Sequence, residues 1–114
     1  MDLRRTPRYP LHTKALIAFP DKTVQACKAE NVSTFGVSIA LDRQIPLSVP
    51  YQVRFVIKNR DESHTITARV KATYGALGSD GKFRVGFSFL DENPERTKLI
   101  NTLTDNLFIS GIQR

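Results

Sequence analysis

Apolar and polar residues alternate with a period of two in several separate segments of this chain. Such a period turns one side of a segment toward a core and the other toward water, which is typical of antiparallel β-strands. The clear segments are 37–41, 52–58, 65–73 and 84–89, and weaker ones are 15–19 and 24–29. The pattern therefore predicts a mainly β protein with six short strands.

Turn-forming residues separate these segments. Polar or glycine-rich stretches that predict tight connections lie at 20–22, 59–63 and 78–81. The stretch 42–50 contains Pro46 and Pro50, which cannot donate to a strand ladder, and it predicts a longer crossing. Because closure removes exposed sheet edges, we predict a small six-stranded antiparallel β-barrel.

The C-terminal part changes to a helical spacing. Asn93 followed by Pro94 is a typical helix cap and first helical position. A helix starting there presents one apolar face, made of Leu99, Ile100, Leu103 and Leu107. A helix of this length needs a packing partner, so we expect a C-terminal α-helix that lies on the barrel or over one of its mouths.

The first twelve residues hold three arginines and show no apolar alternation. We expect residues 1–12 to form a mobile arm. Residues 13–114 would then form the barrel with its helix, and 114 residues suit a single domain.

Composition limits the class of function and the compartment. The 17 Lys and Arg residues against 11 Asp and Glu residues give a net charge of +6, which suits an anionic partner. Cys27 is the single cysteine and cannot form an internal disulfide. No apolar run suits a membrane span or a secretory signal. We therefore expect a cytoplasmic location.

The residue types needed for catalysis are not grouped in the sequence. The two histidines, His12 and His64, are far apart, and Cys27 has no second thiol with which to form a zinc pair. The sequence contains no glycine-rich phosphate-binding motif. We therefore expect binding rather than enzyme activity, with no metal and no cofactor.

Two polar clusters stand out from the strand pattern. Arg4-Arg5-Thr6-Pro7-Arg8 contains Arg-x-x-x-Arg, and Asn31-Val32-Ser33-Thr34-Phe35-Gly36 leads straight into the segment 37–41. Their order and spacing resemble the two signature motifs of the PilZ domain family, RxxxR and [D/N]xSxxG. The segment 83–90 and the C-terminal helix extend the resemblance to about residues 4–104. It implies a receptor for cyclic di-GMP, a bacterial second messenger with two guanines and two phosphates.

The arginines suit such a ligand chemically. An arginine fork donates to both acceptors on one edge of guanine, and it also pairs with phosphate and stacks on flat rings. We expect Arg4 and Arg8 to contact the guanine edge and the phosphates, with Arg5 in support. By themselves these arginines would be interpreted as a solvated basic tail, and the second cluster favours the binding interpretation.

In the second cluster, Asn31 occupies the Asp/Asn position that the family uses for a guanine contact. Asparagine offers one neutral acceptor oxygen, so it holds the N–H groups of guanine less strongly than aspartate does. Ser33 offers a hydroxyl for a phosphate or a nearby backbone group. Gly36 suits a positive φ or a close backbone approach. The alternative is that Asn31 and Ser33 form only a polar turn.

Two more residues bear on the ligand. Tyr74 follows a clear strand at a place where the family often has an aromatic residue facing the ligand, and packing at the barrel rim is the alternative role. Leu3 precedes the first motif arginine, where the family has arginine when two stacked ligands bind. A leucine there indicates one ligand per domain.

The resulting hypothesis is a receptor whose arm closes over cyclic di-GMP and presents a new surface to an unidentified protein partner. A nucleic-acid-binding β-barrel is one alternative, although the clustering of arginines on the arm makes nucleic acid an unlikely ligand. A PilZ-like protein-interaction module without a ligand is another.

Overall fold

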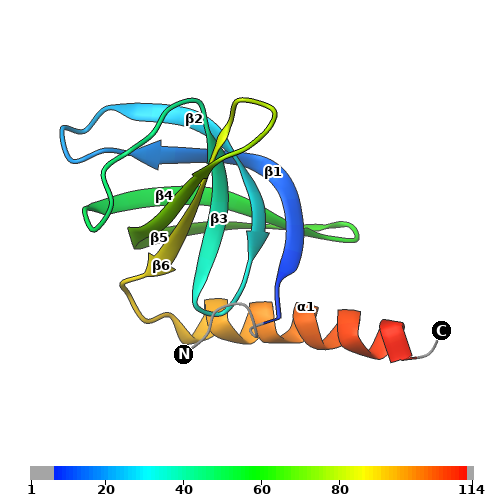
Figure 1. Cartoon of the computed structure of the whole chain (residues 1–114). Helices are drawn as coiled ribbons and strands as arrows, with labels where there is room; N and C mark the ends of the chain where they lie inside the picture. Colours follow the sequence, from blue (N-terminus) through cyan, green and yellow to red (C-terminus); the bar gives the residue numbers. More distant parts are fainter. Residues whose placement is uncertain (1–6, 113–114) are drawn as a thin grey trace.

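The structure, a computed structural model, describes the backbone of residues 7–112 and the side chains of residues 7–106. In this part of the chain, six strands form a closed antiparallel barrel in the order β1-β2-β3-β6-β5-β4, and one helix follows (Figure 1). The elements are β1 (Tyr9–Ala18), β2 (Val24–Val32), β3 (Gly36–Leu41), β4 (Pro50–Asn59), β5 (Glu62–Leu77), β6 (Phe83–Phe89) and α1 (Pro94–Ile112). The predicted small β-barrel with a C-terminal helix is confirmed.

The predicted period of two is visible in the burial along β4. Val53 and Phe55 are buried inside the barrel, whereas Gln52 and Arg54 are exposed on its outer surface. The same alternation in the other strands, together with two residues of α1, gives one core. Its largest fully buried side chains are Phe55, Ile17, Ile39, Leu41, Ile57, Val32, Val53 and Val70 from the strands and Ile100 and Leu103 from the helix. The interior of so small a barrel is filled by side chains, so a ligand has to bind on the outer surface or at an end.

Strand β1 begins at Tyr9, ahead of the boundary after residue 12 that the sequence predicted for the arm. Tyr9 pairs with Val32 of β2, and its hydroxyl donates to the carbonyl of Lys58 at 3.2 Å. The pairing shifts register after Pro10, near His12, whose φ is 50°. Residues 9–12 therefore belong to the barrel wall.

Helix α1 begins as the sequence predicted. The side-chain oxygen of Asn93 accepts the backbone N–H of Arg96 at 3.0 Å, and Pro94 is the first helical residue. Ile100 and Leu103 are buried in the core cluster, and the helix lies across one end of the barrel (Figure 1). The side chain of Leu107, the last member of the predicted apolar face, lies outside the described residues.

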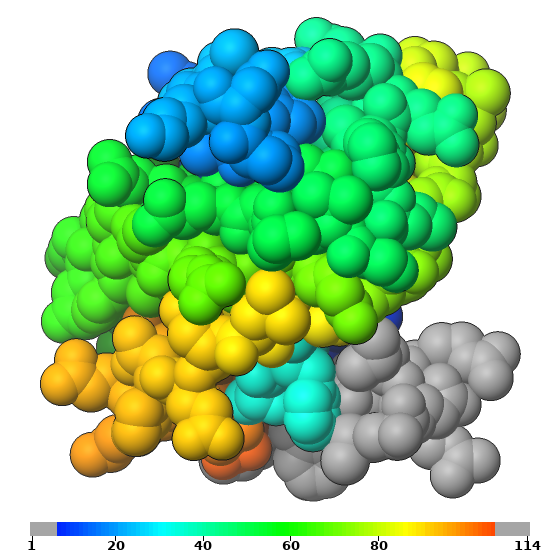
Figure 2. Space-filling model, turned by 90° about the vertical axis from the view of Figure 1, so that its left-hand side faces the viewer, coloured from blue at the N-terminus to red at the C-terminus, as the bar shows by residue number. Residues whose placement is uncertain are grey.

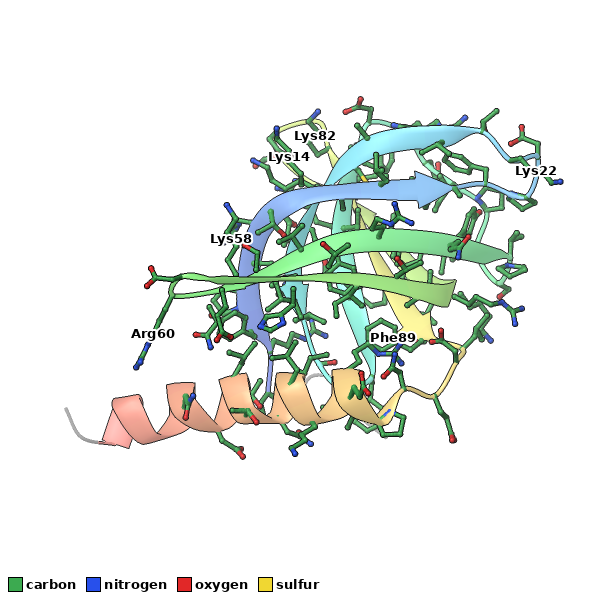
Figure 3. The ribbon with its side chains drawn as sticks, turned by 180° about the vertical axis from the view of Figure 1, so that it is seen from behind. Lys14, Lys22, Lys58, Arg60, Lys82 and Phe89 are labelled. Atoms are coloured by element: carbon green, nitrogen blue, oxygen red, sulfur yellow. The ribbon has the colours of Figure 1, made fainter. Side chains whose placement is uncertain are left out.

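Arg96 fastens the first turns of the helix to the barrel. Its side chain is 3% exposed and forms an ion pair with Asp91 at 3.0 Å, and its guanidinium lies 3.9 Å from the centroid of the Phe89 ring. Phe89 ends β6 and lies just above the start of α1 (Figure 3). Charge-assisted hydrogen bonds and cation–π contacts are stronger than contacts between neutral groups. Arg96 therefore holds the start of α1 in place against the barrel.

Candidate functional site

One row of residues crosses the outer surface of the barrel over four strands. Asn31 of β2 pairs with Ser38 of β3, Ser38 pairs with Gly86 of β6, and Gly86 pairs with Tyr74 of β5. Strands far apart in the sequence therefore place Asn31 and Tyr74 at the two ends of a single row.

Two β-bulges flank this row. In β2 the partners pass from Ala29 with Ile39 to Asn31 with Ser38, so Glu30 is the extra residue. In β5 the partners pass from Ala72 with Phe87 to Tyr74 with Gly86, so Thr73 is the extra residue. A bulge inserts one residue and redirects the side chain that follows, a device common beside binding sites. Each bulge brings the end residue of the row to the outer surface.

The row lies in a cleft that collects most of the residues singled out in the sequence. It is lined by Arg8, Asn31, Ser33, Gly36, Val37, Ser38, Thr73, Tyr74, Gly86 and Phe87. The cleft has a volume of about 20 Å³, which is room for about one water molecule. A ligand much larger than a water molecule would thus extend over the rim of the cleft.

Arg8 is the one residue of the first motif's arginines that the structure describes, and it is exposed at the cleft. Arg4, Arg5 and Leu3 lie outside the described residues. The structure therefore brings the end of the first motif together with the second motif.

Ser33 and Gly36 build the loop between β2 and β3. The Ser33 hydroxyl oxygen accepts the backbone N–H of Phe35 at 3.1 Å, and the Ser33 N–H donates to the carbonyl of Gly36 at 2.8 Å. This is the polar turn considered as an alternative role. Because the hydroxyl accepts here, its own hydrogen is left to donate to an anionic oxygen in the cleft.

Close approach, and not a positive φ, explains the glycines of the cleft. A Cβ at Gly36 would stand 1.9 Å from the carbonyl oxygen of Phe87. A Cβ at Gly86 would stand 2.1 Å from Cε1 of Tyr74, whose side chain is 42% exposed. Neither glycine is among the described residues with a positive φ. Packing at the cleft floor therefore favours glycine at both positions.

Sequence reasoning missed Val37, Ser38, Thr73, Gly86 and Phe87 as lining residues. The Thr73 hydroxyl donates to the carbonyl of Gly86 at 2.9 Å. A glycine inside the otherwise alternating segment 84–89 is a signal for close approach, and it could have drawn attention to Gly86.

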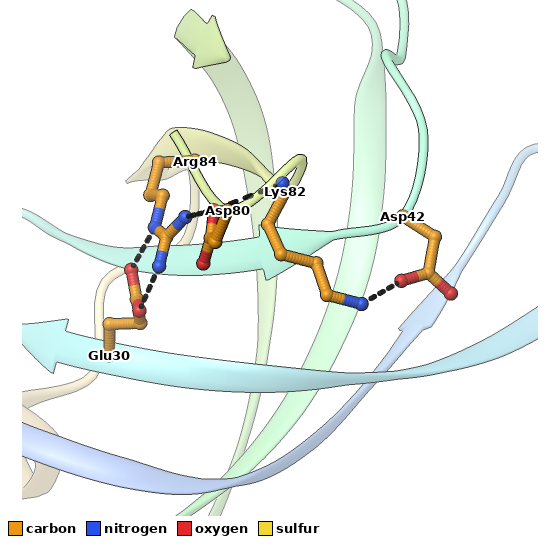
Figure 4. A network of polar contacts seen from close by, with 5 residues as sticks. All are labelled: Glu30, Asp42, Asp80, Lys82 and Arg84. Atoms are coloured by element: carbon orange, nitrogen blue, oxygen red, sulfur yellow. Dashed lines mark hydrogen bonds and ion pairs between the residues drawn. The ribbon is translucent and has the colours of Figure 1, made fainter. Parts of the chain in front are cut away.

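A network of ion pairs lies beside the cleft (Figure 4). Arg84 donates to both carboxylate oxygens of Glu30, at 3.0 and 3.2 Å, and to Asp80 at 2.5 Å. The side chain of Lys82 pairs with Asp42, and the backbone N–H of Lys82 donates to Asp80 at 3.1 Å. Hydrogen bonds from Arg84 and from the Lys82 N–H lower the pKa of Asp80 to about 2, so the Asp80 carboxylate is ionised at neutral pH.

A second hollow lies on the other side of the β2–β3 loop. Thr34 and Phe35 of that loop line a groove of about 730 Å³ together with Phe89 and the first turns of α1. In Figure 2 the cyan residues of the loop lie beside the yellow residues around 90 and the orange start of the helix. The β2–β3 loop thus lies between the cleft and the groove beside the start of α1.

Positive charge extends beyond the arm. Lys14 and Lys28 are directly opposite each other on β1 and β2, and both are exposed. Lys14, Lys22 and Lys58 project outward from the barrel (Figure 3). Such a field raises the local concentration of an anionic ligand.

Some features are not found in the described residues. No group of three or more potential metal ligands occurs among them. Within the same residues, no helix has both the length and the apolar character for crossing a bilayer. Burial raises the pKa of the Cys27 thiol to about 11, so this thiol stays protonated at neutral pH.

Solved structures similar to this one share its fold at low sequence identity. The inhibitor of motility MotI/DgrA of Bacillus subtilis superposes with a TM-score of 0.75 at 9% identity, over 100% of this chain and 54% of that one. YcgR of Escherichia coli in complex with c-di-GMP gives a TM-score of 0.76 at 12% identity, over 96% and 48%. The PilZ domain of YcgR with c-di-GMP gives 0.66 at 14% identity, over 98% and 96%. The chain thus spans about half the length of the first two proteins.

The sequence comparisons agree with this fold. No curated protein sequence matches the chain significantly. The PilZ domain family matches over residues 2–106, which includes both motifs, the whole barrel and most of the helix. The chain therefore belongs to the PilZ domain family.

Proposed function

We propose that this chain is a receptor domain for cyclic di-GMP and that the ligand binds at the cleft on β2, β3, β5 and β6. The observation that carries the proposal is that Arg8 of the first motif and Asn31, Ser33 and Gly36 of the second line the same cleft. Family membership and the c-di-GMP complexes of structurally similar YcgR support it.

The cleft residues have complementary roles in this proposal. Arg4 and Arg8 donate to the guanine edge and the phosphates, and Arg5 adds charge. Asn31 accepts from the guanine N–H groups, and Ser33 donates to a phosphate oxygen. Tyr74 offers its exposed ring for stacking. Gly36 and Gly86 keep the cleft floor flat.

The small volume of the cleft explains why the arginine arm is needed for binding. Because only about 20 Å³ lies within the cleft, the ligand must lie on its rim and needs cover from elsewhere in the chain. The arginine arm closes over the ligand, and ordering it costs conformational entropy that charge-assisted hydrogen bonds and stacking must exceed. The closed arm presents a new surface to a protein partner. The domain works in the cytoplasm, with one ligand per domain, and catalyses no reaction.

Isothermal titration calorimetry tests the proposal. Wild type is expected to bind cyclic di-GMP but neither GTP nor cyclic di-AMP. Arg8→Ala is expected to lose about tenfold or more in affinity, or about 1.4 kcal/mol. Arg54→Ala makes the same change of charge on β4, away from the cleft, and is the matched control. Equal affinity of wild type and Arg8→Ala would contradict the role of the arm arginines in binding. If wild type does not bind cyclic di-GMP, the proposed receptor function is wrong.

Salt dependence separates this function from binding to nucleic acid. A protein that neutralises many phosphates loses affinity steeply as salt rises. We expect a mild salt dependence for cyclic di-GMP and no binding of single-stranded oligonucleotides of mixed sequence. Tight binding of oligonucleotides of any sequence would favour the nucleic-acid alternative.

A further inference from the structure

The bulge in β2 decides which polar side chain faces Ser38. Glu30 and Asn31 are adjacent and both half-buried. With the extra residue at Glu30, Asn31 pairs with Ser38. If the ladder continued without the bulge, the register of Ala29 with Ile39 would place Glu30 opposite Ser38 instead. The position of the bulge therefore selects an amide over a longer carboxylate at the end of the cleft row.

An ion pair to another strand holds this extra residue. Nε and Nη2 of Arg84 in β6 donate to Oε1 and Oε2 of Glu30 at 3.0 and 3.2 Å. This bidentate arrangement has a strong directional preference. The pair crosses β3, where Arg84 is paired with the small residue Ala40. The two side chains are only 20% and 34% exposed, so the pair is partly shielded from solvent.

The guanidinium is itself fixed from the other side. Its Nη1 donates to Asp80 at 2.5 Å, in the loop between β5 and β6 (Figure 4). A Cβ at Gly78 would stand 2.6 Å from this Nη1, so the loop closes tightly around the guanidinium. Arg84 thus reaches Glu30 from a fixed position.

The second bulge is anchored to the same strand. The hydroxyl of its extra residue, Thr73, donates to the carbonyl of Gly86 at 2.9 Å. Arg84 and Gly86 are two residues apart on β6 and lie on the same face of the strand. Side-chain contacts to β6 therefore hold both bulges that orient the ends of the cleft row.

We propose that Glu30, Arg84 and Thr73 are positioning residues for ligand binding, although none belongs to either signature motif. Glu30 and Arg84 hold the β2 bulge that turns Asn31 into the cleft, and Thr73 holds the β5 bulge that turns Tyr74 into it. The binding consequence rests on the proposed function, because it assumes that the cleft takes cyclic di-GMP.

The direction in which Glu30→Ala changes the affinity for the ligand distinguishes a positioning role from a purely electrostatic one. Glu30→Ala removes a negative charge close to a ligand with two phosphates, and Coulomb attraction alone would then strengthen binding. Positioning predicts the opposite, a loss of about tenfold in affinity as Asn31 leaves its orientation. Asp42→Ala removes a carboxylate from the neighbouring Lys82 pair and is the matched control, with affinity expected to stay within about twofold.

Thr73→Val tests the second bulge without a change of charge. It keeps the shape of the side chain but removes the hydroxyl, and it is also expected to weaken binding about tenfold. Thermal unfolding of each variant checks whether the fold is retained. Affinity equal to or higher than that of wild type in Glu30→Ala, measured by calorimetry on a folded protein, would overturn the role of the ion pair.

A measurement without ligand tests the positioning directly. The side-chain amide signals of Asn31, assigned by their loss in Asn31→Ala, are expected to shift in the ¹H–¹⁵N spectrum of Glu30→Ala and to stay in place in Asp42→Ala. Unchanged Asn31 signals in Glu30→Ala would overturn the inference. If wild type binds no cyclic di-GMP, the proposed function fails, and these signals still decide whether Glu30 positions Asn31.

Discussion

The ring of Tyr74 lies against the backbone of Gly86, so closely that a Cβ at residue 86 would stand 2.1 Å from Cε1 and 2.3 Å from Cζ of the ring. The ring belongs to a partly exposed side chain and can move aside. At Gly36 the obstacle is instead the carbonyl oxygen of Phe87, which is part of the barrel backbone and cannot move without breaking the sheet.

This difference predicts a graded series of alanine variants. Gly36→Ala is expected to lower the free energy of unfolding by about 3 kcal/mol, and Gly86→Ala by about 1 kcal/mol. Gly75→Ala, where the nearest atoms lie 4.0 Å away, is the control and is expected to be neutral or stabilising by about 0.5 kcal/mol. Urea unfolding measures all three, and a Gly36→Ala protein as stable as wild type would contradict the packing at the cleft floor.

Tyr74 is expected to contribute to binding through its ring. Tyr74→Ala should weaken cyclic di-GMP binding by about 1 to 3 kcal/mol, the range for a base stacked on an aromatic side chain. Tyr74→Phe keeps the ring and should bind nearly as well as wild type. Leu77→Ala, on the same strand and also exposed, is the control. Calorimetry that finds equal affinity for Tyr74→Ala would restrict Tyr74 to a packing role.

Asn31→Asp is expected to tighten binding by about tenfold, or about 1.4 kcal/mol. A carboxylate offers two charged acceptors to the N1–H and N2–H groups of guanine, whereas asparagine offers one neutral acceptor. The measurement is a titration of both proteins at the same salt concentration. Weaker binding by Asn31→Asp would mean that the N–H edge of guanine does not face this residue.

Stability is expected to fall in acid through two carboxylates. Burial acts to raise the pKa of Asp91, but hydrogen bonds from Arg96 and from the Arg69 N–H outweigh it and leave the pKa lowered. Hydrogen bonds from Arg84 and the Lys82 N–H lower the pKa of Asp80 from 3.8 to about 2.

A folded-state pKa below the unfolded value means that each carboxylate stabilises the fold above the unfolded value of 3.8 and loses this contribution as the pH falls below it, for Asp80 as the pH falls toward 2. Asp91→Asn should therefore lower stability at neutral pH and give a flatter dependence on pH in acid. Asp61→Asn, in the exposed β4–β5 turn, should follow wild type. Urea unfolding at several pH values makes the comparison, and parallel curves for wild type and Asp91→Asn would contradict a role for this ion pair in acid stability.

The parts of this fold that follow from local chemistry could be predicted from the sequence. Alternation located the strands, because side chains in a strand face opposite sides in turn. The Asn93 and Pro94 pair located the start of α1 because its first backbone N–H groups need a cap. The start of β1 at Tyr9 does not follow from the sequence pattern, since the first residues of the strand include Pro10 and join the barrel through an irregular pairing with β2.

The cleft was predicted only in part. The sequence predicts Arg8, Asn31, Ser33, Gly36 and Tyr74 as site residues, and all five line the cleft. The sequence does not predict the bulges, because the extra residues Glu30 and Thr73 are each followed by another polar residue, and alternation does not show which of the two faces outward. Contacts such as that of Glu30 with Arg84 join residues 54 positions apart, and they become visible only once the strand order is known.

The strand order of the barrel also links recognition to folding. Asn31 and Tyr74 come to lie at the two ends of one row only when β6, the last strand in the sequence, lies between β3 and β5. An unfolded or half-assembled chain has no such row, so a ligand of the cleft binds the completed barrel alone. By mass action, cyclic di-GMP would then raise the melting temperature of the domain once the ligand concentration exceeds the dissociation constant. The cyclic di-GMP concentration in the cell would also set how long the receptor survives proteolysis.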